Sequence, residues 1–460
     1  MGSLSTSLNI ALQSLQAEQG AISTTSNNIA NVNTPGYARQ RTNFAESTPV
    51  QQGDLTLGSG VHLDQVTSLR DSILDLRANQ ETQQQGQLNA FLGAAQQIQG
   101  LFNETTGTGL QASLSAFFNS LSQLSTNPSD PNVRQAVLTA AQNLATGFNQ
   151  TSANLSTLQR NEDSSVTQSV NQINTLTAQI AAVNIQVASA TGSGQNAGPF
   201  VDQRQQLINQ LSGLVDVSEV DAGNGSLTLS TSNGAPLVVA GQSFQLATQP
   251  DPTTGLQEVF SLGSDITAKI TSGALAGQLQ IRDQEIPGIQ SSLDALASNL
   301  ATDVNTQNQA GFDLNGAPGG DIFVPPPAGG VGAAATLTVS LTDPSKIAAS
   351  ADGTAGDNTN ANALLAIQNE AIVNGQTPLN AYSGLIFKIG NNVSTAQTQQ
   401  LSGGLVLQQI QNLQGGVSGV DINEESANLI RFQNAYQASA QISAIIDSLM
   451  QATINMVSGV

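Results

Sequence analysis

Large apolar residues recur at seven-residue intervals near both ends of the chain, and this spacing strongly constrains what those ends can form. Near the N-terminus the repeat consists of Leu8, Leu15, Ile22 and Ile29. Near the C-terminus a pair of series interleaves, namely Phe432, Ser439, Ile446 and Thr453 with Ala435, Ile442, Leu449 and Met456. Apolar heptads are typical of helices that pack along a narrow seam. Both ends are therefore predicted to be helices that pair with each other and with other copies.

A second N-terminal series alternates with the first, and polar residues interrupt it. It consists of Leu4, Ala11, Glu18, Thr25 and Val32. A polar residue at one seam position can fix the register of paired helices at a cost in stability. We expect Glu18 either to face water, which is the simpler alternative, or to meet a polar partner.

The end helices are predicted to need a partner. Fully burying one Leu or Ile side chain stabilises a structure by about 1.5–3 kcal/mol. Four or five such residues on one helix do not offset an ordering cost of about 1–2 kcal/mol per residue. Each end should therefore be loosely ordered alone and helical once packed, which is the behaviour of an assembly element.

The first helix is predicted to end near Asn31, because Pro35 disfavours a helical conformation at the preceding residue. Pro35 and Gly36 suit the centre of a type II turn. Downstream, Asp130 is a good N-cap for a helix that begins at Pro131 and reaches about residue 187. Extended segments are expected at 38–44, 54–57 and 61–66. A short strand is expected at 337–341, a helix at 362–374, and a joint at Gly415-Gly416.

The predicted fold class is mainly α with a β-rich insertion: a long helical bundle or coiled-coil shaft formed by both chain ends, plus an outer β domain. The expected segments are an N-terminal assembly helix with an extended hairpin region (1–66), a helical shaft (67–198), a β-rich outer domain (199–272), a return helix (273–310), a Gly/Pro-rich loop with a short strand (311–360), the C-terminal portion of the shaft (361–417) and a C-terminal assembly helix (418–460).

Composition argues against enzymatic and metal functions. Among 460 residues there is no Cys and one His, so His/Cys metal clusters are impossible. His62 falls on the polar face of a predicted strand and is interpreted as a surface residue. The densest acidic group, Asp421, Glu424 and Glu425, suits the first turn of a helix, where carboxylates face the positive end of the helix dipole. No enzymatic activity, catalytic residue, cofactor or metal site is predicted.

Charge and hydropathy argue against nucleic acid and membrane partners. The formal net charge is -20, which disfavours both phosphate backbones and anionic membrane surfaces. No segment approaches the roughly 18 consecutive apolar residues of a membrane span, and no cleaved secretory leader is recognisable. The missing cysteine reflects either chance loss or passage, unfolded, into an oxidising exterior.

Two segments resemble one protein family. Residues 26–40, SNNIANVNTPGYARQ, are similar to the N-terminal signature shared by flagellar rod, hook and hook-associated proteins. Residues 418–440, SGVDINEESANLIRFQNAYQASA, resemble the family of the first hook-associated protein, which joins hook to filament. The segments 311–316 and 356–358 add to this resemblance. Asn423 stands where the family usually has Asp, and the acidic charge here is at Asp421.

The resemblance implies a structural subunit of the bacterial flagellum, concerned with motility and located outside the cell at the hook–filament junction. It implies unfolded export through the flagellar type III pathway, with a cytoplasmic chaperone bound to the C-terminal region beforehand. The implied partners are other copies of the chain, hook protein, and a second junction protein or flagellin. The paired end helices would form an inner tube, the shaft the next layer and the β domain the outer surface. A further outer domain of larger relatives is expected to be absent.

The residues assigned to the assembly interface combine the heptads with these signatures. They are Leu8, Leu15, Ile22, Ile29, Asn27, Asn28, Asn31, Asn33, Pro35, Gly36, Tyr37, Asp421, Glu424, Glu425, Phe432, Tyr436, Ile442, Ile446, Leu449 and Met456. In this hypothesis the four N-terminal heptad residues pack against Ile442, Ile446, Leu449 and Met456.

Three alternatives remain open at this point. The chain could be another axial component, such as hook protein or flagellin, although residues 418–425 argue against this. It could be a cell-wall hydrolase, or its β domain could act as a surface adhesin.

Overall fold

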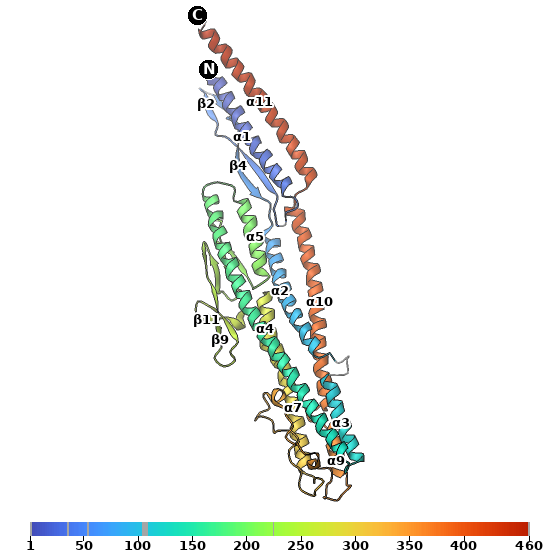
Figure 1. The fold of residues 1–460 in the computed structure, drawn as a ribbon. Coiled ribbons are helices and arrows are strands. Elements are labelled where there is room, and N and C mark those ends of the chain that lie inside the picture. Colours follow the sequence, from blue (N-terminus) through green and yellow to red (C-terminus); the bar gives the residue numbers. More distant parts are fainter. Residues whose placement is uncertain (1, 35, 53–54, 104–108, 224, 459–460) are drawn as a thin grey trace.

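The computed structural model describes residues 2–34, 36–52, 55–103, 109–223 and 225–458. The molecule is a long rod in which both termini lie at the same end (Figure 1). Most of its residues are helical, and the helices are α1 (Gly2–Ala30), α2 (Ser72–Leu101), α3 (Leu110–Thr126), α4 (Pro131–Gly192), α5 (Gly198–Ser212), α6 (Gly273–Gln280), α7 (Ile286–Gln309), α8 (Ala333–Thr336), α9 (Thr359–Ala366), α10 (Pro378–Ser418) and α11 (Ile422–Ser458).

The strands form short antiparallel sheets. They are β1 (Gln40–Glu46), β2 (Val50–Gln52), β3 (Leu55–Leu57), β4 (Val61–Ser68), β5 (Ser218–Asp221), β6 (Leu227–Ser230), β7 (Pro236–Val239), β8 (Gln242–Ser243), β9 (Leu246–Pro250), β10 (Gln257–Ser261) and β11 (Ser264–Asp265). The sheet orders are β1-β4, β2-β3, β5-β6-β7-β8 and β11-β10-β9. The fold is therefore mainly α with a β-rich insertion, which confirms the predicted class.

At the end of the rod that carries both termini, α1, α11 and the strands β1 to β4 form a separate structural unit. Helix α1 runs antiparallel to α11 and lies between it and the β1–β4 hairpin (Figure 1). This element is called the end unit below. It is joined to the rest of the rod through the start of β1, the start of α2 and the residues between α10 and α11.

The shaft is built from α2, α3, α4, α7 and α10 around one long apolar core. Helix α4 has 62 residues, or about 93 Å at 1.5 Å per residue. It begins as predicted: the side chain of Asp130 accepts a hydrogen bond from the Asn132 N–H, and Pro131 occupies the first turn. Fully buried residues from several helices fill this core, among them Leu114, Phe117, Leu144, Leu293 and Val304.

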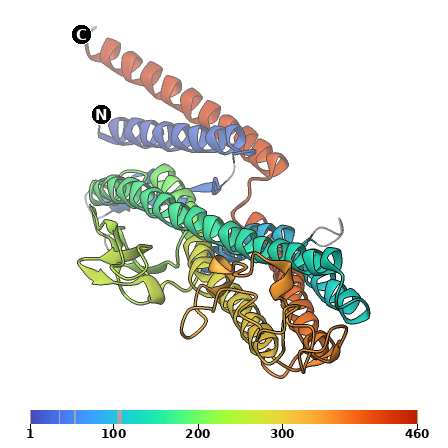
Figure 2. The same ribbon diagram turned by 60° about the horizontal axis from the view of Figure 1, so that its bottom comes forward.

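The β-rich insertion packs on one side of α4, as the rotated view shows (Figure 2). Two buried or half-buried asparagines of α4 attach it. The amide of Asn174 exchanges two hydrogen bonds of 2.8 Å with the backbone of Leu246. The Asn184 amide donates to the carbonyls of Leu227 and Ala240, each at 2.8 Å. The insertion is thus bonded to the shaft through side-chain amides as well as through its apolar core.

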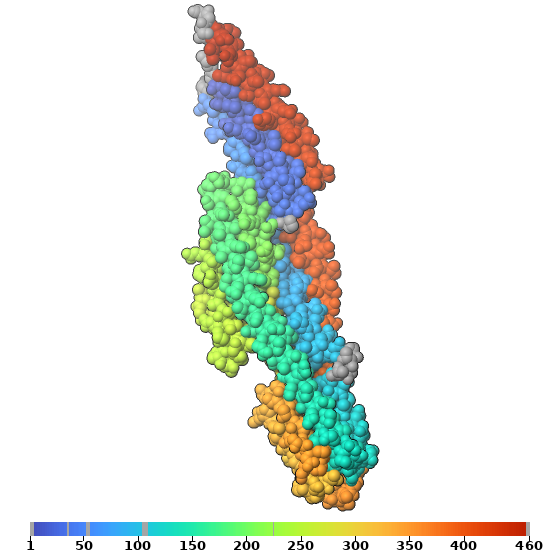
Figure 3. Space-filling model, viewed as in Figure 1, coloured from blue at the N-terminus to red at the C-terminus, as the bar shows by residue number. Residues whose placement is uncertain are grey.

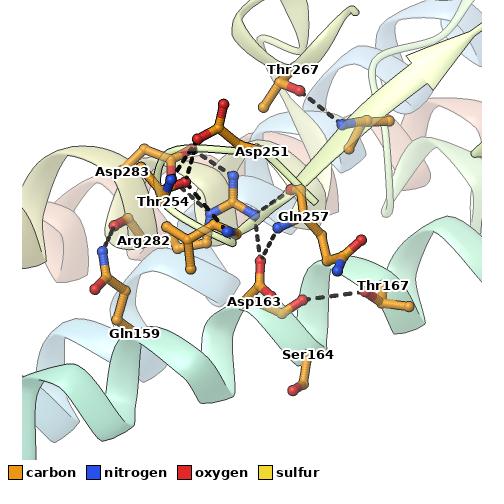
Figure 4. A network of polar contacts seen from close by, with 12 residues as sticks. Gln159, Asp163, Ser164, Thr167, Asp251, Thr254, Gln257, Thr267, Arg282 and Asp283 are labelled. Atoms are coloured by element: carbon orange, nitrogen blue, oxygen red, sulfur yellow. Dashed lines mark hydrogen bonds and ion pairs between the residues drawn. The ribbon is translucent and has the colours of Figure 1, made fainter. Parts of the chain in front are cut away.

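An ion-pair network joins the segment between α6 and α7 to α4 (Figure 4). Residues 281–285 form one π-helical segment between α6 and α7. Its Arg282 is buried and contacts Asp163 of α4 and Asp283, each at 2.7 Å. Its guanidinium also donates to the Gln257 carbonyl of β10 at 2.5 Å. Burial alone would lower the pKa of Arg282, and the two carboxylates raise it.

The structure differs from the sequence-based expectations at several places. Residues 337–341 form no strand, and Val339 makes only one isolated bridge with Phe323. The helix expected at 362–374 is α9, which ends at Ala366 and continues as one 3-10 turn to Asn369. The joint lies at residues 419–421, because α10 passes through Gly415-Gly416 without a break. Asp54 of the expected 54–57 strand lies outside the described residues.

Candidate assembly interface

Helix α1 and helix α11 meet along a seam of mostly small side chains. Ala11, Ala17 and Ala21 of α1 are at most 4% exposed. The hydroxyl groups of Ser14 on α1 and Ser439 on α11 lie 3.0 Å apart across the seam. Small side chains let the two backbones approach closely, but each contributes little burial energy. The two helices are therefore closely packed, and each side-chain contact between them contributes little stability.

The larger heptad residues of α1 are only half-buried. Leu8, Leu15, Ile22 and Ile29 all retain partial exposure. Helix α1 packs on both α11 and the strands β1 and β4. A side chain at Gly20 would put its Cβ 2.8 Å from Leu63 of β4. The large residues were expected at the centre of the seam, whereas the buried apolar residues of α1 are alanines.

Glu18 lies at the margin of the seam and is partly exposed. The residue is half-buried, and its Oε2 atom is buried with no hydrogen-bond partner among the described residues. Burial raises the pKa of the Glu18 carboxyl, and the positive charge of Arg431 opposes that rise. Glu18 thus interrupts the apolar seam with a carboxylate, and one oxygen of that carboxylate has no hydrogen-bond donor among the described residues.

One buried amide organises the end of α1. The Nδ2 of Asn28 donates to the Gln40 carbonyl at 2.8 Å and to Oε2 of Glu425 at 3.0 Å. Its Oδ1 accepts from the Gln40 N–H at 2.9 Å and from the Tyr37 hydroxyl at 2.8 Å. Asn28 therefore joins the end of α1, the start of β1 and the first turn of α11.

Arg39 clamps the first turn of α11 from the other side. Its Nε contacts Oε1 of Glu425 at 2.7 Å, and its two terminal nitrogens contact Glu424 at 2.7 and 3.0 Å. The Arg39 N–H donates to the Ser418 carbonyl at the end of α10. The bonds to Glu424 are the main reason that the pKa of Arg39 is raised. Asp421 caps the same turn by accepting from the Asn423 N–H at 2.8 Å.

A second cluster connects the end unit to the shaft. Arg70 contacts Oδ1 of Asp202 on α5 at 2.8 Å and donates to the Gly36 carbonyl at 2.8 Å. The other oxygen of Asp202 accepts from the Ala38 N–H at 3.3 Å. Burial raises the pKa of Asp202, and the hydrogen bond from Arg70 opposes the rise. The turn after α1 is therefore held to both α5 and the approach to α2.

Most of the predicted polar residues gather in this region. Asn28, Tyr37, Glu424 and Glu425 belong to one network, and Gly36 has the left-handed backbone, φ +76°, that a type II turn requires. Asn31 bonds to Asn27 within its own helix end, and Asn33 is exposed. Pro35 lies outside the described residues.

Of the four α11 residues predicted to pack against α1, one is buried in the single chain. Ile446 is buried at 7% exposure, whereas Ile442, Leu449 and Met456 are exposed by 52%, 50% and 74%. Those three residues keep half or more of their surface uncovered, and their place in an interface between copies stays a prediction. Phe432 is half-buried and contacts Phe44 of β1, with ring centroids 6.2 Å apart. Tyr436 is 37% exposed.

The exposed side of α11 is unusually apolar. Seven of its large apolar side chains are between 50% and 74% exposed: Ile422, Ile430, Ile442, Ile445, Leu449, Ile454 and Met456. Four of them, Ile442, Ile445, Leu449 and Met456, lie on one side of the helix by its period of 3.6 residues, and these four are called the α11 face below. Exposed large apolar residues on one side of a helix mark interaction sites in soluble proteins.

The sequence analysis missed three charged residues of the site. Arg39 and Arg70 were not singled out, and Asp202 lies far away in the sequence. Basic residues are rare here, with 12 Lys and Arg in 460 residues. Arg39 lies within the expected extended segment 38–44 and Arg70 follows the segment 61–66, and a rare basic residue at each of these positions was a usable signal. The link to Asp202 depends on the tertiary fold and had no local signal.

Within the described residues no three His, Asp or Glu side chains are grouped to hold a metal ion. No helix in the described part of the chain has the length and hydropathy of a membrane span.

Three family models match segments of the chain. The model for the flagellar hook-associated protein FlgK helical domain matches residues 95–323. The model for the flagella basal body rod protein matches residues 8–37, which contain most of α1 and the turn after it. The model for the flagellar basal body rod FlgEFG protein C-terminal region matches residues 414–456, which contain most of α11.

Curated relatives match almost the whole chain. Flagellar hook-associated protein 1 of Escherichia coli K12 is 30% identical over 549 aligned positions, which cover 98% of this chain and 100% of that protein. Its namesake in Bacillus subtilis 168 is 30% identical, with 97% of each chain covered. The alignment with the E. coli protein has more positions than this chain has residues, so that relative contains segments that this chain lacks.

Among solved structures, the flagellar hook junction protein FlgK from Burkholderia pseudomallei has a similar fold. The TM-score is 0.66 at 20% sequence identity, and the match covers 74% of this chain and 100% of that chain. At this level of identity the similarity concerns the fold.

Proposed function

The chain belongs to the family of flagellar hook-associated protein 1, and from this membership we propose how it assembles. It is a structural subunit of the bacterial flagellum that joins hook to filament. It associates with other axial components of the flagellum. Its relatives are structural flagellar proteins, and we further propose that the chain has no catalytic role.

We propose that copies of the chain polymerise through their end units. The observation that carries this proposal is the α11 face, whose apolar side chains are half or more exposed in the single chain. Burying one such side chain completely is worth about 1.5–3 kcal/mol. The polar network around Asn28 supports the proposal, because it fixes how α1 and α11 are presented together.

The proposed arrangement in the polymer follows the layers of the molecule. The end unit would lie innermost, the shaft outside it and the β-rich insertion outermost. Support comes from the fold, in which the insertion lies on the shaft, away from the end unit (Figure 1). In this proposal the segments 1–66 and 418–460 act as the assembly elements, and 199–272 acts as the outer domain.

We propose hook protein as the neighbour on one side, and a second junction protein or flagellin on the other. The chain would reach this extracellular position unfolded, through the flagellar type III pathway, after a cytoplasmic chaperone has bound its C-terminal region. The absence of cysteine supports this route, because stray thiols would cross-link in an oxidising exterior. The exposed α11 face supports a need for protection before assembly.

The position of the protein can be tested with one label. Thr253 is exposed in the turn between β9 and β10. Because the chain has no cysteine, the variant Thr253→Cys carries one thiol and takes a fluorescent label at that position alone. Fluorescence of flagellated cells should show one spot between hook and filament. Signal along the whole filament or the whole hook would contradict the proposal.

Assembly can be tested on the α11 face. Ile445→Asp with Leu449→Asp adds charge to two exposed residues and should abolish self-association while the fold is kept. Gln441→Asp, an exposed residue of the same helix, is the matched control. A second pair, Ile22→Asp with Ile446→Asp, disrupts the α1–α11 seam and should leave a soluble molecule that does not assemble. Normal assembly of both pairs would refute the mechanism.

A further inference from the structure

Two separate apolar cores lie along the single helix α4. Its buried apolar residues from Val137 to Leu158 belong to the core of the shaft, together with residues of α3 and α7. Those from Val166 to Ala181 belong to a second core, together with residues of α5, α6 and the β-rich insertion. These cores are called the shaft core and the insertion core below. In Figure 3 the insertion, in yellow-green, and the loops after α7, in orange, lie at different levels of the rod, and α4 reaches from one to the other.

A polar stretch of α4 separates the two cores. Residues 159–165, QRNEDSS, contain no apolar side chain. Glu162 lies four residues from both Leu158 and Val166, which places it on the same side of the helix as the cores. It is only 8% exposed, and burial raises the pKa of its carboxyl. The apolar surface of α4 is thus interrupted between Leu158 and Val166, over about 12 Å at 1.5 Å per residue.

The chain segment that crosses this stretch is also polar. Arg282 makes ion pairs of 2.7 Å with Asp163 and Asp283, and the Gln159 amide donates to the Arg282 carbonyl at 2.9 Å. These four residues and Glu162 are called the polar belt below (Figure 4). Hydrogen bonds and ion pairs contribute little net stability on folding, because they replace equivalent bonds to water. The belt therefore joins the two cores without packing them into one.

The other two long helices carry no apolar core past the belt either. Beside the insertion core, the buried side chains of α2 include Asn79 and Gln83, which donate to Glu219 and to the Val217 carbonyl. Helix α10 has no buried residue after Ala396. A cleft of about 1080 Å³, lined largely by Gln, Asn, Ser and Thr side chains, lies between α2 and this portion of α10.

Cooperative units of a protein follow its contiguous packed regions. We propose that the rod consists of two cooperative unfolding units that meet inside α4 at the polar belt, and that the insertion core opens while the shaft core stays folded. Helix α4 can be divided in this way because helical order is lost residue by residue once it has begun to melt from one end. This inference goes beyond the proposed function and does not depend on it.

The division has a consequence for the end unit. Asp202, which anchors the end unit through Arg70 and the Ala38 N–H, lies on α5. The apolar residues of α5, Ile208 and Leu211, belong to the insertion core. Opening of the insertion core would therefore also release the end unit from its attachment to the rod, while α3, α7 and the first half of α4 remain packed.

The test places one cavity in each core on the same helix and measures hydrogen exchange of the full-length monomer by mass spectrometry. Ile173 and Leu144 are both fully buried. Ile173→Ala should speed exchange of the slow amides of α5 and the insertion by about thirtyfold or more, and leave α3 and α7 at wild-type rates. Leu144→Ala should have the reverse effect. Gln168→Ala, at an exposed position of α4, should change neither set.

The outcomes are distinct. Faster exchange confined to the core that carries the substitution supports the inference, whereas equal acceleration in both cores by either variant would show one cooperative unit and overturn it. Should an alanine variant fail to fold, Ile173→Val and Leu144→Val make smaller cavities, and each should speed exchange in its own core by about two- to tenfold.

Exchange at single-residue resolution along α4 locates the boundary. In Ile173→Ala the accelerated amides should begin beyond the polar belt, from about Val166 onward, and those before Leu158 should keep their wild-type rates. An acceleration that is spread evenly along α4, or that changes at a position outside 158–166, would contradict the assignment of the belt as the boundary.

Discussion

At the scale of single residues, the amide of Asn28 shows how the end unit is held in register. All hydrogen-bonding groups of this amide are used, and its four hydrogen bonds are made with Tyr37 in the turn, Gln40 of β1 and Glu425 of α11. An aspartate would lack the two N–H donors and would place a negative charge against Glu425. The requirement for an amide here is therefore chemical as well as steric.

Tyr37 should make the end unit sensitive to alkali. Burial is the main cause that raises the pKa of Tyr37 from 10.0 to about 12, and the nearby carboxylates of Asp202 and Glu425 add to the rise. Because the folded state holds the phenol proton more tightly, this stabilisation is complete below pH 10 and is lost as the pH rises through 12. Phenolate absorbance should show one late tyrosine that is missing in Tyr37→Phe.

The stability of Tyr37→Phe relative to wild type gives a second test of the same assignment. Tyr37→Phe should be less stable than wild type at pH 8, because the Asn28 acceptor loses one donor, and the difference should shrink as the pH approaches 12. A constant difference across this range would contradict the assignment.

Glu18 should weaken the α1–α11 seam at neutral pH. The raised pKa of Glu18 means that its favourable contribution is present below the ordinary value of 4.5 and is lost as the pH rises through the folded-state value. Glu18→Gln should therefore stabilise the end unit at pH 7 and have little effect near pH 3.5. Guanidinium unfolding followed by circular dichroism measures both values. Gln16→Glu, on an exposed position of α1, should have little effect at either pH.

At the scale of elements, two glycines of α2 have opposite roles. A Cβ at Gly86 would lie 2.1 Å from the Gly213 carbonyl oxygen, whereas one at Gly93 would meet no atom within 4 Å. Gly86→Ala should destabilise the shaft by about 1–3 kcal/mol through overpacking. Gly93→Ala should stabilise it by about 0.5–1 kcal/mol through helix propensity. Thermal unfolding of the two variants decides this, and similar shifts in both would be evidence against the close contact of α2 with the segment after α5.

The heptads predicted the end helices but only some of the face that they bury. Phe432, Ser439, Ile446 and Thr453 are at least half-buried, as a seam requires. In the second series Ile442 and Leu449 are exposed, and the residues that directly follow them, Ser443 and Met450, are half-buried instead. A straight helix rotates a seven-residue series by about 20° per repeat. Periodicity therefore identifies a helix more reliably than it identifies the covered face.

Helix α3 was not assigned from the sequence although its signal was present. Leu110, Leu114, Phe117, Leu121 and Leu124 recur at helical spacing, and all are buried. The loop that links Phe323 to Val339 could not be predicted in the same way. Its contacts with α3 and α7 depend on segments that are distant in the sequence.

At the scale of the whole molecule, net charge should control self-association. Each copy has a formal net charge of -20, so copies repel at low ionic strength, and salt screens that repulsion over about 10 Å at 0.1 M. Association through uncharged apolar faces should therefore become stronger between about 0.02 and 0.3 M salt. Light scattering at constant protein concentration measures this. Weaker association at higher salt would mean that ion pairs between copies dominate the contact.

The overall architecture could be predicted because its main elements have local signals. The 62-residue α4 has a capping residue and an unbroken apolar repeat, and the β-rich insertion has alternating strands. The position of the end unit on the shaft had no such signal. It depends on Arg70 and Asp202, which are 132 positions apart.

The antiparallel contact of α1 with α11 also has a kinetic consequence. Ser14 and Ser439, which meet across this seam, are 425 positions apart in the chain. Closing so long a loop is entropically costly, and contacts of high sequence separation form late in folding. The α2–α10 contact of the shaft is also long-range, because Gln85 and Gln400 are 315 positions apart. Helices α3 and α4 are adjacent in the sequence and pack on each other, so this part of the shaft can form first. Helix α1, which is synthesised first, therefore stays without its partner helix until α11 has also been synthesised.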